Sequence, residues 1–298
     1  MNVVIKVNDE VKNKMIEYYK DKKRDKVIPY VVFQADDEDT VITMYESGKV
    51  MFQGVSADVD ASMWGVELEK KEKAKEDSVY LNTSAVGSDE VGTGDYFGPI
   101  VVTASFVFKS QVKELQEMGI LDSKKMTDEN ILKVAPRLSK MIKYRSIILT
   151  NSEYNLKYSK DVNMNKIKSI MHNKVLWQLI HEENPQYDYI IIDEFVKEKS
   201  YYNYLNGISN IQRNITFMTK AEDKNLAVAA SSVISRYIFL KEFDKLSDSL
   251  GIPLPKGSGA TVDTIGEEIV EKFGSDKLNE IAKLNFRNTQ RILHTLIY

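Results

Sequence analysis

Three pairs of adjacent carboxylates stand beside apolar runs of the sequence. The pairs are Asp89 with Glu90, Asp193 with Glu194, and Glu222 with Asp223. Carboxylates gathered within about 5 Å repel by roughly 3 kcal/mol per pair at an effective dielectric constant near 20, so a cluster of them needs cations. The chain has no cysteine and only 3 histidines, which favours a hard, oxygen-binding ion such as Mg²⁺ or Mn²⁺. Two such ions can activate a water and stabilise the leaving oxygen of a phosphoryl transfer.

A structural role for each pair is the alternative, because an acidic pair at a strand end often combines a turn residue with a helix cap. Adjacent side chains on a strand point to opposite faces, so Asp89 and Glu90 can share a site only where the strand bends. We expect that bend at the glycines that follow, Gly92, Gly94 and Gly98. Their spacing does not fit a dinucleotide fingerprint and no Walker lysine follows, so the segment favours close approach of a sugar-phosphate backbone to bare peptide.

The larger part of the chain, called the body, alternates apolar strands with helices. The expected strands span 85–89, 99–108, 144–150, 187–193 and 215–219, and the expected helices span 128–142, 165–183, 199–206 and 224–245. This order predicts an α/β fold in which a mixed sheet is covered by helices on both faces. Carboxylates at the strand ends of such a sheet lie where chemistry usually occurs.

A smaller unit, called the head, precedes the body. Its expected strands are at 3–7, 27–35, 40–46 and 49–54, and its expected helices are at 9–23 and 58–75. The pattern predicts a small antiparallel sheet with helices on one face and the other face free. A charged stretch at 67–77 indicates a linker, so we place the head at 1–80 and the body at 84–298.

The head carries 17 acidic and 13 basic residues over positions 1–80, so it has no general positive field. Nucleic-acid binding by the head would need a local basic patch or a complementary shape. The patch candidates are Lys20, Lys22, Lys23 and Arg24. The aromatic candidates for a groove-binding face are Tyr30 or Phe33, Tyr45 and Phe52, although aromatic residues at alternate positions are also typical of a core.

Composition narrows the class of protein further. A net charge of −3 argues against binding of nucleic acid by bulk electrostatics, and the absence of cysteine excludes disulfides and predicts a reducing compartment. The start of the chain does not have the pattern of a secretory signal, and the apolar window at 226–240 contains Arg236, which indicates a buried helix. We expect a cytoplasmic monomer with no membrane association and no obligatory protein partner.

Four segments in order resemble the type 2 ribonucleases H, and among them the bacterial ribonuclease HIII group. They are "SDEVGTGDYFGPIVVTA" (88–104), "LDSKKMT" (121–127), "IIDEF" (191–195) and "KAEDKNLAVAASSVISR" (220–236). The resemblance extends from about residue 84 to the C-terminus. It implies a ribonuclease H-like fold that hydrolyses the RNA strand of RNA/DNA hybrids with two divalent ions, Mg²⁺ or Mn²⁺, leaving 5′-phosphate and 3′-hydroxyl ends. The head resembles the TATA-binding-protein-like domain that binds substrate in this group.

The resemblance also assigns site residues. Asp89, Glu90 and Asp193 match the first three catalytic, metal-binding carboxylates. The triplet at 220–222 makes Glu222 the fourth, with Asp223 as the alternative. The substrate-binding candidates are Gly92, Thr93, Gly94, Ser123, Lys124, Lys125, Asn165, Lys256 and Ser258, with His172 either lining the same groove or lying on the polar exterior.

Two other functions stay open at this point. Ribonuclease HII carries an arginine between the two glycines where this chain has Thr93, and this difference favours the ribonuclease HIII group. Incision at single ribonucleotides in duplex DNA, as by ribonuclease HII, is the first alternative. A non-catalytic nucleic-acid-binding module, whose acidic residues only cap helices, is the second. A comparison of substrates separates the first alternative, and a metal titration separates the second.

Overall fold

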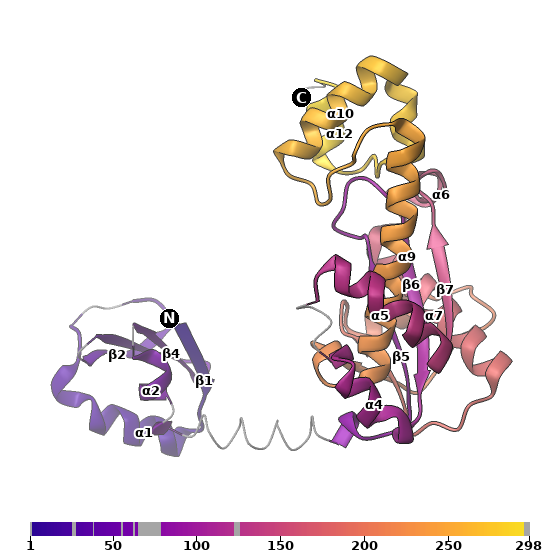
Figure 1. Ribbon diagram of the computed structural model, residues 1–298. Coiled ribbons are helices and arrows are strands. Elements are labelled where there is room, and N and C mark those ends of the chain that lie inside the picture. Colours follow the sequence, from indigo (N-terminus) through magenta and orange to yellow (C-terminus); the bar gives the residue numbers. More distant parts are fainter. Residues whose placement is uncertain are drawn as a thin grey trace. The chain divides into compact units, whose positions relative to one another are not determined.

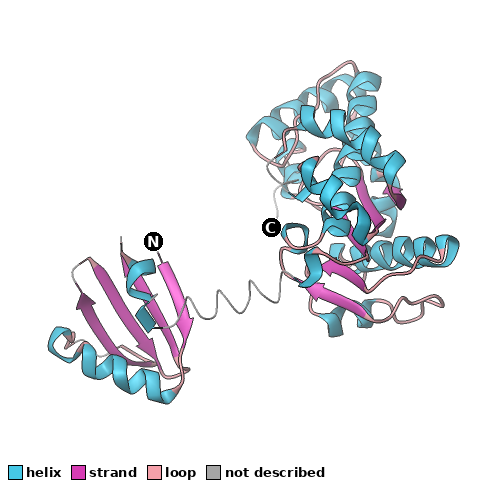
Figure 2. Ribbon diagram, turned by 60° about the horizontal axis from the view of Figure 1, so that its bottom comes forward, coloured by secondary structure: helices cyan, strands magenta, loops and turns pink. Residues whose placement is uncertain are grey.

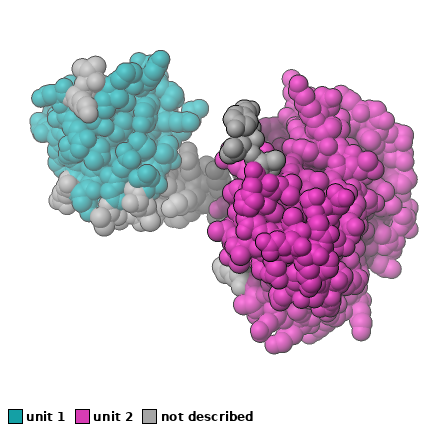
Figure 3. Space-filling model, turned by 90° about the horizontal axis from the view of Figure 1, so that it is seen from above, with its two compact units in different colours: residues 1–77 teal, residues 78–298 magenta. Residues whose placement is uncertain are grey.

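A computed structural model describes residues 2–25, 28–37, 39–54, 56–61, 63–64, 79–121 and 126–294. The chain divides into two compact units, residues 1–77 and residues 78–298, drawn in different colours in Figure 3. The names head and body are kept for these two units. The charged stretch at 67–77 and most of the expected helix at 58–75 lie outside the described residues.

The head is a four-stranded antiparallel sheet with helices on one face (Figures 1 and 2). Its elements are β1 (Asn2–Lys6), α1 (Asp9–Tyr18), a 3₁₀ turn η1 (Lys20–Lys22), β2 (Val31–Asp37), β3 (Thr40–Tyr45), β4 (Lys49–Gly54) and α2 (Ala57–Ala61). The strand order is β1-β4-β3-β2. The Asn8 side chain begins α1 by accepting from the Val11 amide at 2.9 Å. Gly48, at a φ of 77°, makes the turn between β3 and β4.

The aromatic candidates of the head divide between the two faces of its sheet. Phe33 and Phe52 are buried in the core beneath α1 and α2, so their expected role on a binding face is wrong. Tyr45 lies on the opposite face from the buried Met44. Tyr30 is exposed in the turn before β2, with a φ of 65°.

The basic patch of the head is largely neutralised. Lys20 pairs with Glu17, Lys22 with Asp37, and Arg24 with Asp36. A lysine or arginine that already holds a carboxylate contributes little attraction for phosphate. These ion pairs weigh against the patch at 20–24 as the main contact of the head with nucleic acid.

The body has a five-stranded mixed sheet of order β7-β6-β5-β8-β9. Its strands are β5 (Ala85–Val91), β6 (Ile100–Val107), β7 (Lys143–Leu149), β8 (Tyr189–Asp193) and β9 (Ile215–Met218). Its helices are α4 (Val112–Glu117), α5 (Asp128–Met141), α6 (Asn151–Lys157), α7 (Met164–Glu183), α8 (Glu198–Tyr204), α9 (Leu226–Leu250), α10 (Ala260–Phe273), α11 (Leu278–Ile281) and α12 (Arg287–Ile292). Short 3₁₀ turns are η3 (Lys109–Gln111), η5 (Ala221–Asp223) and η6 (Ser275–Lys277).

Helices cover both faces of this sheet, as expected from the order of strands and helices (Figure 1). One core lies between the sheet and α9 with α4 and α5, and a second lies between the sheet and α7 with α8. The long α9 packs directly on β5 because Gly87 has no side chain, and a Cβ there would collide with the backbone of Ala227 and Val228. In the parts of the chain that the structure describes, no helix is long and apolar enough to cross a membrane.

Candidate active site

The carboxyl ends of β5 and β8 meet at one edge of the sheet. The two strands are parallel, and Ser88 pairs with Ile192, so Asp89 and Asp193 follow in register on neighbouring strands. The Asp89 side chain faces α9, where it accepts a hydrogen bond from the Ser232 side chain and one from the Glu90 amide at 2.9 Å. This edge therefore brings together two carboxylates that are far apart in the sequence.

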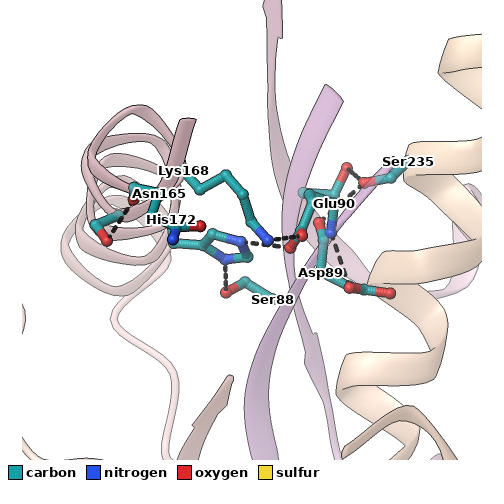
Figure 4. Close-up of polar contacts among 9 residues, drawn as sticks. Ser88, Asp89, Glu90, Asn165, Lys168, His172 and Ser235 are labelled. Atoms are coloured by element: carbon teal, nitrogen blue, oxygen red, sulfur yellow. Dashed lines mark hydrogen bonds and ion pairs between the residues drawn. The ribbon is translucent and has the colours of Figure 1, made fainter. Parts of the chain in front are cut away.

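Glu90 points to the opposite layer of the fold. Its Oε2 lies 2.9 Å from Nε2 of His172, and its Oε1 pairs with Nζ of Lys168, both on α7 (Figure 4). His172 Nδ1 in turn lies 2.7 Å from Ser88 Oγ, and the Lys168 ammonium lies 4.0 Å from the centre of the Phe195 ring. Glu90 is thus held from two sides by nitrogen atoms.

The expected bend occurs at Gly92, one of the glycines named for it, but it follows the acidic pair and does not bring the two carboxylates together. β5 remains extended and paired with β6 as far as Val91 opposite Val101, and the chain turns only at Gly92, with a φ of 95°. Asp89 and Glu90 therefore keep the alternation of a regular strand. Their two carboxylates belong to different layers, one beside α9 and one beside α7.

The two layers give the paired carboxylates opposite pKa shifts. Burial and the neighbouring charge of Glu90 raise the pKa of Asp89 to about 7, with a further contribution from Asp193. Burial also raises the pKa of Glu90, but His172 and Lys168 outweigh it and bring this pKa to about 2. The charge of Glu90 is compensated by the protein, whereas ionisation of Asp89 adds a charge beside two others.

Asp193 and Glu222 are linked through the backbone. Asp193 Oδ1 accepts from the Ala221 amide at 2.9 Å, which fixes η5 against the end of β8. Glu222 is 2% exposed, whereas Asp223 is exposed on the same turn. Glu194, the neighbour of Asp193, is half-buried and pairs with the exposed Lys197. The buried position of Glu222 favours it over Asp223 as the fourth acidic residue.

The donor atoms at this edge fit a hard divalent cation by their chemistry. Asp89, Asp193 and Glu222 offer carboxylate oxygens, and a cation beside Asp89 would relieve the repulsion that raises its pKa. Among the described residues, no three acidic or histidine side chains converge closely enough to form a complete cation cage. The carboxylates at this edge are of the type that binds Mg²⁺ or Mn²⁺, although, in the described part of the chain, they are not gathered into a closed set of ligands.

The glycine segment presents open backbone directly after β5. Gly94 is exposed, and a Cβ on it would meet no atom within 4 Å. Gly92 is buried, and a Cβ there would collide with the carbonyl of Pro99. Thr93, between them, is half-buried. Within the segment at 92–94, Gly94 thus leaves room for a ligand to approach the peptide.

The other substrate-binding candidates occupy two further places. Asn165 is exposed near the start of α7, one turn before Lys168. Lys256 pairs with Asp128, which also binds Arg236 at 3.0 Å, and the exposed Ser258 accepts from Asn288 through its carbonyl at 3.1 Å. The candidates Ser123, Lys124 and Lys125 lie outside the described residues.

Two residues beside Glu90 differ from what the sequence pattern indicates. His172 is fully buried and bound to Glu90 and Ser88, so neither an exposed groove nor the polar exterior describes it. Lys168 is a site residue that the acidic pairs and the glycine segment do not reveal. Its spacing from Asn165 and from His172, three and four residues on one helix, is the signal that places all three on one face.

Comparisons with known proteins show which family the chain resembles. Residues 86–289 match the model of the family described as Ribonuclease HII, and residues 2–77 match a domain of unknown function, DUF3378. Ribonuclease HIII of Bacillus cereus (strain ATCC 14579) is 39% identical over 307 residues, covering 99% of each chain. Ribonuclease HIII of Bacillus thuringiensis subsp. konkukian (strain 97-27) is 38% identical, again over 99% of each chain.

Solved structures give the same result. A crystal structure of Bst-RNase HIII in complex with Mn²⁺ has a TM-score of 0.71 and 35% identity, and the match covers 99% of this chain and 98% of that chain. RNase H3 of Aquifex aeolicus has a TM-score of 0.57 at 22% identity over 95% of this chain and 99% of that one, which supports the fold.

Proposed function

The chain belongs to the ribonuclease HIII family, and from this we propose that it cuts the RNA strand of RNA/DNA hybrids as an endonuclease. The reaction uses two divalent ions, Mg²⁺ or Mn²⁺, and leaves 5′-phosphate and 3′-hydroxyl ends. The observation that carries the proposal is that Asp89 and Asp193 directly follow the last paired residues of two parallel strands, close in sequence to the open peptide of Gly94. A carboxylate edge beside accessible backbone suits a phosphodiester that must approach a cation.

The acidic residues are proposed to share the work of holding the ions. Asp89, Asp193 and Glu222 would supply oxygens from the side of α9, and Glu90, fixed by Lys168 and His172, would complete the set from the side of α7. Divalent ions held by these carboxylates would supply an activated water and stabilisation of the leaving 3′-oxygen. The protein holds Asp89 through the Ser232 hydroxyl and Asp193 through the Ala221 amide, so each carboxylate keeps its orientation.

The backbone amides of residues 92–94 are proposed to recognise the ribose of the RNA strand. Amide groups at Gly92, Thr93 and Gly94 can donate to the ribose 2′-hydroxyl and to backbone phosphates, and a 2′-hydroxyl is what distinguishes RNA from DNA. The remaining candidates for phosphate contacts are Ser123, Lys124, Lys125, Asn165, Lys256 and Ser258. Lys256 would have to exchange Asp128 for a phosphate, which costs part of the attraction.

A comparison of three labelled duplexes tests this function. With Mg²⁺ or Mn²⁺ present, we expect a continuous RNA/DNA hybrid to be cut at many positions, a duplex with one ribonucleotide to be cut poorly, and DNA to stay intact. EDTA should stop all cleavage because the carboxylates then hold no ion. Efficient incision of the single-ribonucleotide duplex would favour a ribonuclease HII-like activity. Saturable hybrid binding without any cleavage would favour a non-catalytic module.

The head is proposed to bind the hybrid through the open face of its sheet, as a TATA-binding-protein-like domain would. Lys6 and Lys49 are both exposed and stand directly opposite each other on β1 and β4. Like charges in this position destabilise a sheet, and a phosphate between them would remove the repulsion. Tyr45 lies on the same face and offers a stacking surface.

Substitution of both lysines by glutamine should weaken hybrid binding without slowing the chemistry. The slope of binding against salt should fall by roughly 1 for each phosphate that the head no longer neutralises, and kcat at saturating hybrid stays unchanged because the acidic residues are untouched. Fluorescence anisotropy with EDTA measures the affinity. Lys12→Gln with Lys14→Gln, on the surface of α1, is the matched control, and an equal decrease of affinity in both double variants would contradict the open-face proposal.

Partners and location are proposed from composition. The absence of cysteine suits a reducing compartment, which supports a cytoplasmic enzyme that acts as a monomer without an obligatory protein partner. Sedimentation at micromolar concentration tests the monomer, and a stable dimer that is more active than the monomer would overturn it.

A further inference from the structure

Lys283 is a fully buried lysine that the proposed chemistry does not use. It follows α11 and reaches the glycine segment, which is distant from it in the sequence. Its Nζ donates to the carbonyls of Asp95 at 2.8 Å and Gly98 at 2.5 Å, and its own amide donates to the carbonyl of Tyr96 at 2.9 Å. One residue thus binds three peptide carbonyls of the chain that leaves the active site.

Other residues of the body fasten the same four residues, 95–98. The Asn151 side chain also donates to the Gly98 carbonyl at 2.9 Å, and the Gly98 amide donates to the Ile281 carbonyl at 3.0 Å. Gly257 makes two hydrogen bonds with this segment, one to the Asp95 side chain at 2.6 Å and one from the Tyr96 amide at 2.8 Å. Residues 95–98 are therefore held from several sides, whereas the neighbouring Gly94 is open.

Burial of the Lys283 ammonium group lowers the stability of the folded chain because the charge loses its hydration. Burial also lowers the pKa of this lysine to about 7, and only the charge of Asp95 opposes this shift. An apolar side chain of similar length, such as methionine, would avoid the desolvation cost of an ammonium group. The contribution of the lysine therefore lies in the hydrogen bonds that it makes to the Asp95 and Gly98 carbonyls.

We propose that Lys283 is a positioning residue for the substrate. By holding the carbonyls of Asp95 and Gly98, it fixes the curve of residues 95–98 and so sets the direction in which the peptide groups of residues 92–94 face the RNA strand. The inference rests on the proposed function, because it assigns a support to the segment that reads the ribose.

The test is the kinetics of Lys283→Met on a continuous RNA/DNA hybrid at saturating Mn²⁺. Misdirected amides bind the substrate less well, so we expect KM to rise roughly 10-fold, while kcat stays within about threefold because no carboxylate has moved. Amide hydrogen exchange at residues 94–98 should become faster in the full chain. Lys277→Met is the control, since Lys277 lies in the same part of the chain and pairs with Glu280 at the surface.

Each outcome supports or overturns the positioning role. An unchanged KM in a folded Lys283→Met protein overturns the inference, and so does loss of Mn²⁺ affinity by calorimetry, because that result indicates general damage to the site. If Lys283→Met does not fold, Asn151→Ala is the substitute test. Asn151 is one of two side-chain donors to the Gly98 carbonyl, so we expect its loss to raise KM about threefold. An unchanged KM in Asn151→Ala would contradict the positioning role. Wild-type protein that fails to cut the hybrid at all would instead refute the proposed function.

Discussion

Asp89→Asn is expected to remove Mg²⁺- and Mn²⁺-dependent cleavage of an RNA/DNA hybrid, with kcat falling by roughly 1,000-fold or more. The substitution keeps the shape of the side chain and an oxygen that can accept from the Glu90 amide, but it deletes the negative charge that would hold a cation beside Asp193. Hybrid affinity in EDTA should stay within a factor of two or three, since the peptide at 92–94 is unchanged. Single-turnover cleavage of a labelled hybrid measures the rate.

Asp161→Asn is the matched control for this prediction. Asp161 is an exposed aspartate of the same unit, in the turn before α7, and its substitution should leave the rate and the metal dependence unchanged. If Asp89→Asn retained wild-type turnover, the proposal that Asp89 holds a catalytic cation would be wrong.

Asp89→Asn is also expected to stabilise the protein in EDTA at neutral and alkaline pH. The pKa of Asp89 is raised from 3.8 to about 7 in the folded chain, first by burial and then by Glu90. Between these values the folded chain binds more protons than the unfolded chain, so the free energy of unfolding falls as pH rises. Asp89→Asn removes this loss, with a gain that is absent near pH 4, complete above pH 7, and at most about 1.4 kcal/mol per pH unit crossed. Urea denaturation at pH 4 and pH 8 measures it, and an equal effect at both pH values would contradict the assigned cause.

Glu222→Gln and Asp223→Asn should differ in rate by orders of magnitude. Glu222 is buried on η5, and the Ala221 amide beside it is bound to Asp193. In the proposed site its carboxylate would share a cation with Asp193. Its loss should reduce kcat by roughly 100- to 1,000-fold. Asp223 is exposed on the same turn, and its substitution should change kcat by less than about threefold, as is usual for a surface charge.

The two neighbouring variants control each other, because both remove one carboxylate from the same 3₁₀ turn. Calorimetric titration with Mn²⁺ adds a second readout, in which only Glu222→Gln should weaken binding. A large rate loss in Asp223→Asn with a small one in Glu222→Gln would reverse the assignment and make Asp223 the fourth acidic residue.

The strands of the body could be predicted from the sequence because each contains a short apolar run. The runs at 85–89 and 187–193 became β5 and β8, and their parallel pairing explains why Asp89 and Asp193 meet. The direction of Glu90 could not be predicted in the same way. It depends on how far β5 stays paired with β6, and this pairing continues to Val91, beyond the acidic residues.

A local turn and contacts between distant segments explain the other differences. The expected strand at 27–35 begins only at Val31, because the chain makes a turn at Ile28 to Val31 with a hydrogen bond of 3.1 Å. In the head, the choice of face for Phe52 follows from the register of β4 with β1 and β3, and a shift of one residue would reverse it. Lys283 gives no local signal, since its partners lie near residue 97 and its sequence neighbours form short helices.

Gly87 affects how precisely β5 and α9 position the acidic residues. With no side chain between them, the backbone of β5 and the backbone of α9 touch, and the hydroxyl of Ser231 reaches the Gly87 carbonyl at 2.9 Å. The next residues along that helix include Ser235, which reaches the Asp89 carbonyl at 3.2 Å. A methyl group at position 87 would act as a spacer and lift the helix, together with every hydroxyl that orients the acidic edge. The alignment of the acidic residues therefore depends on the absence of a side chain at position 87 of β5.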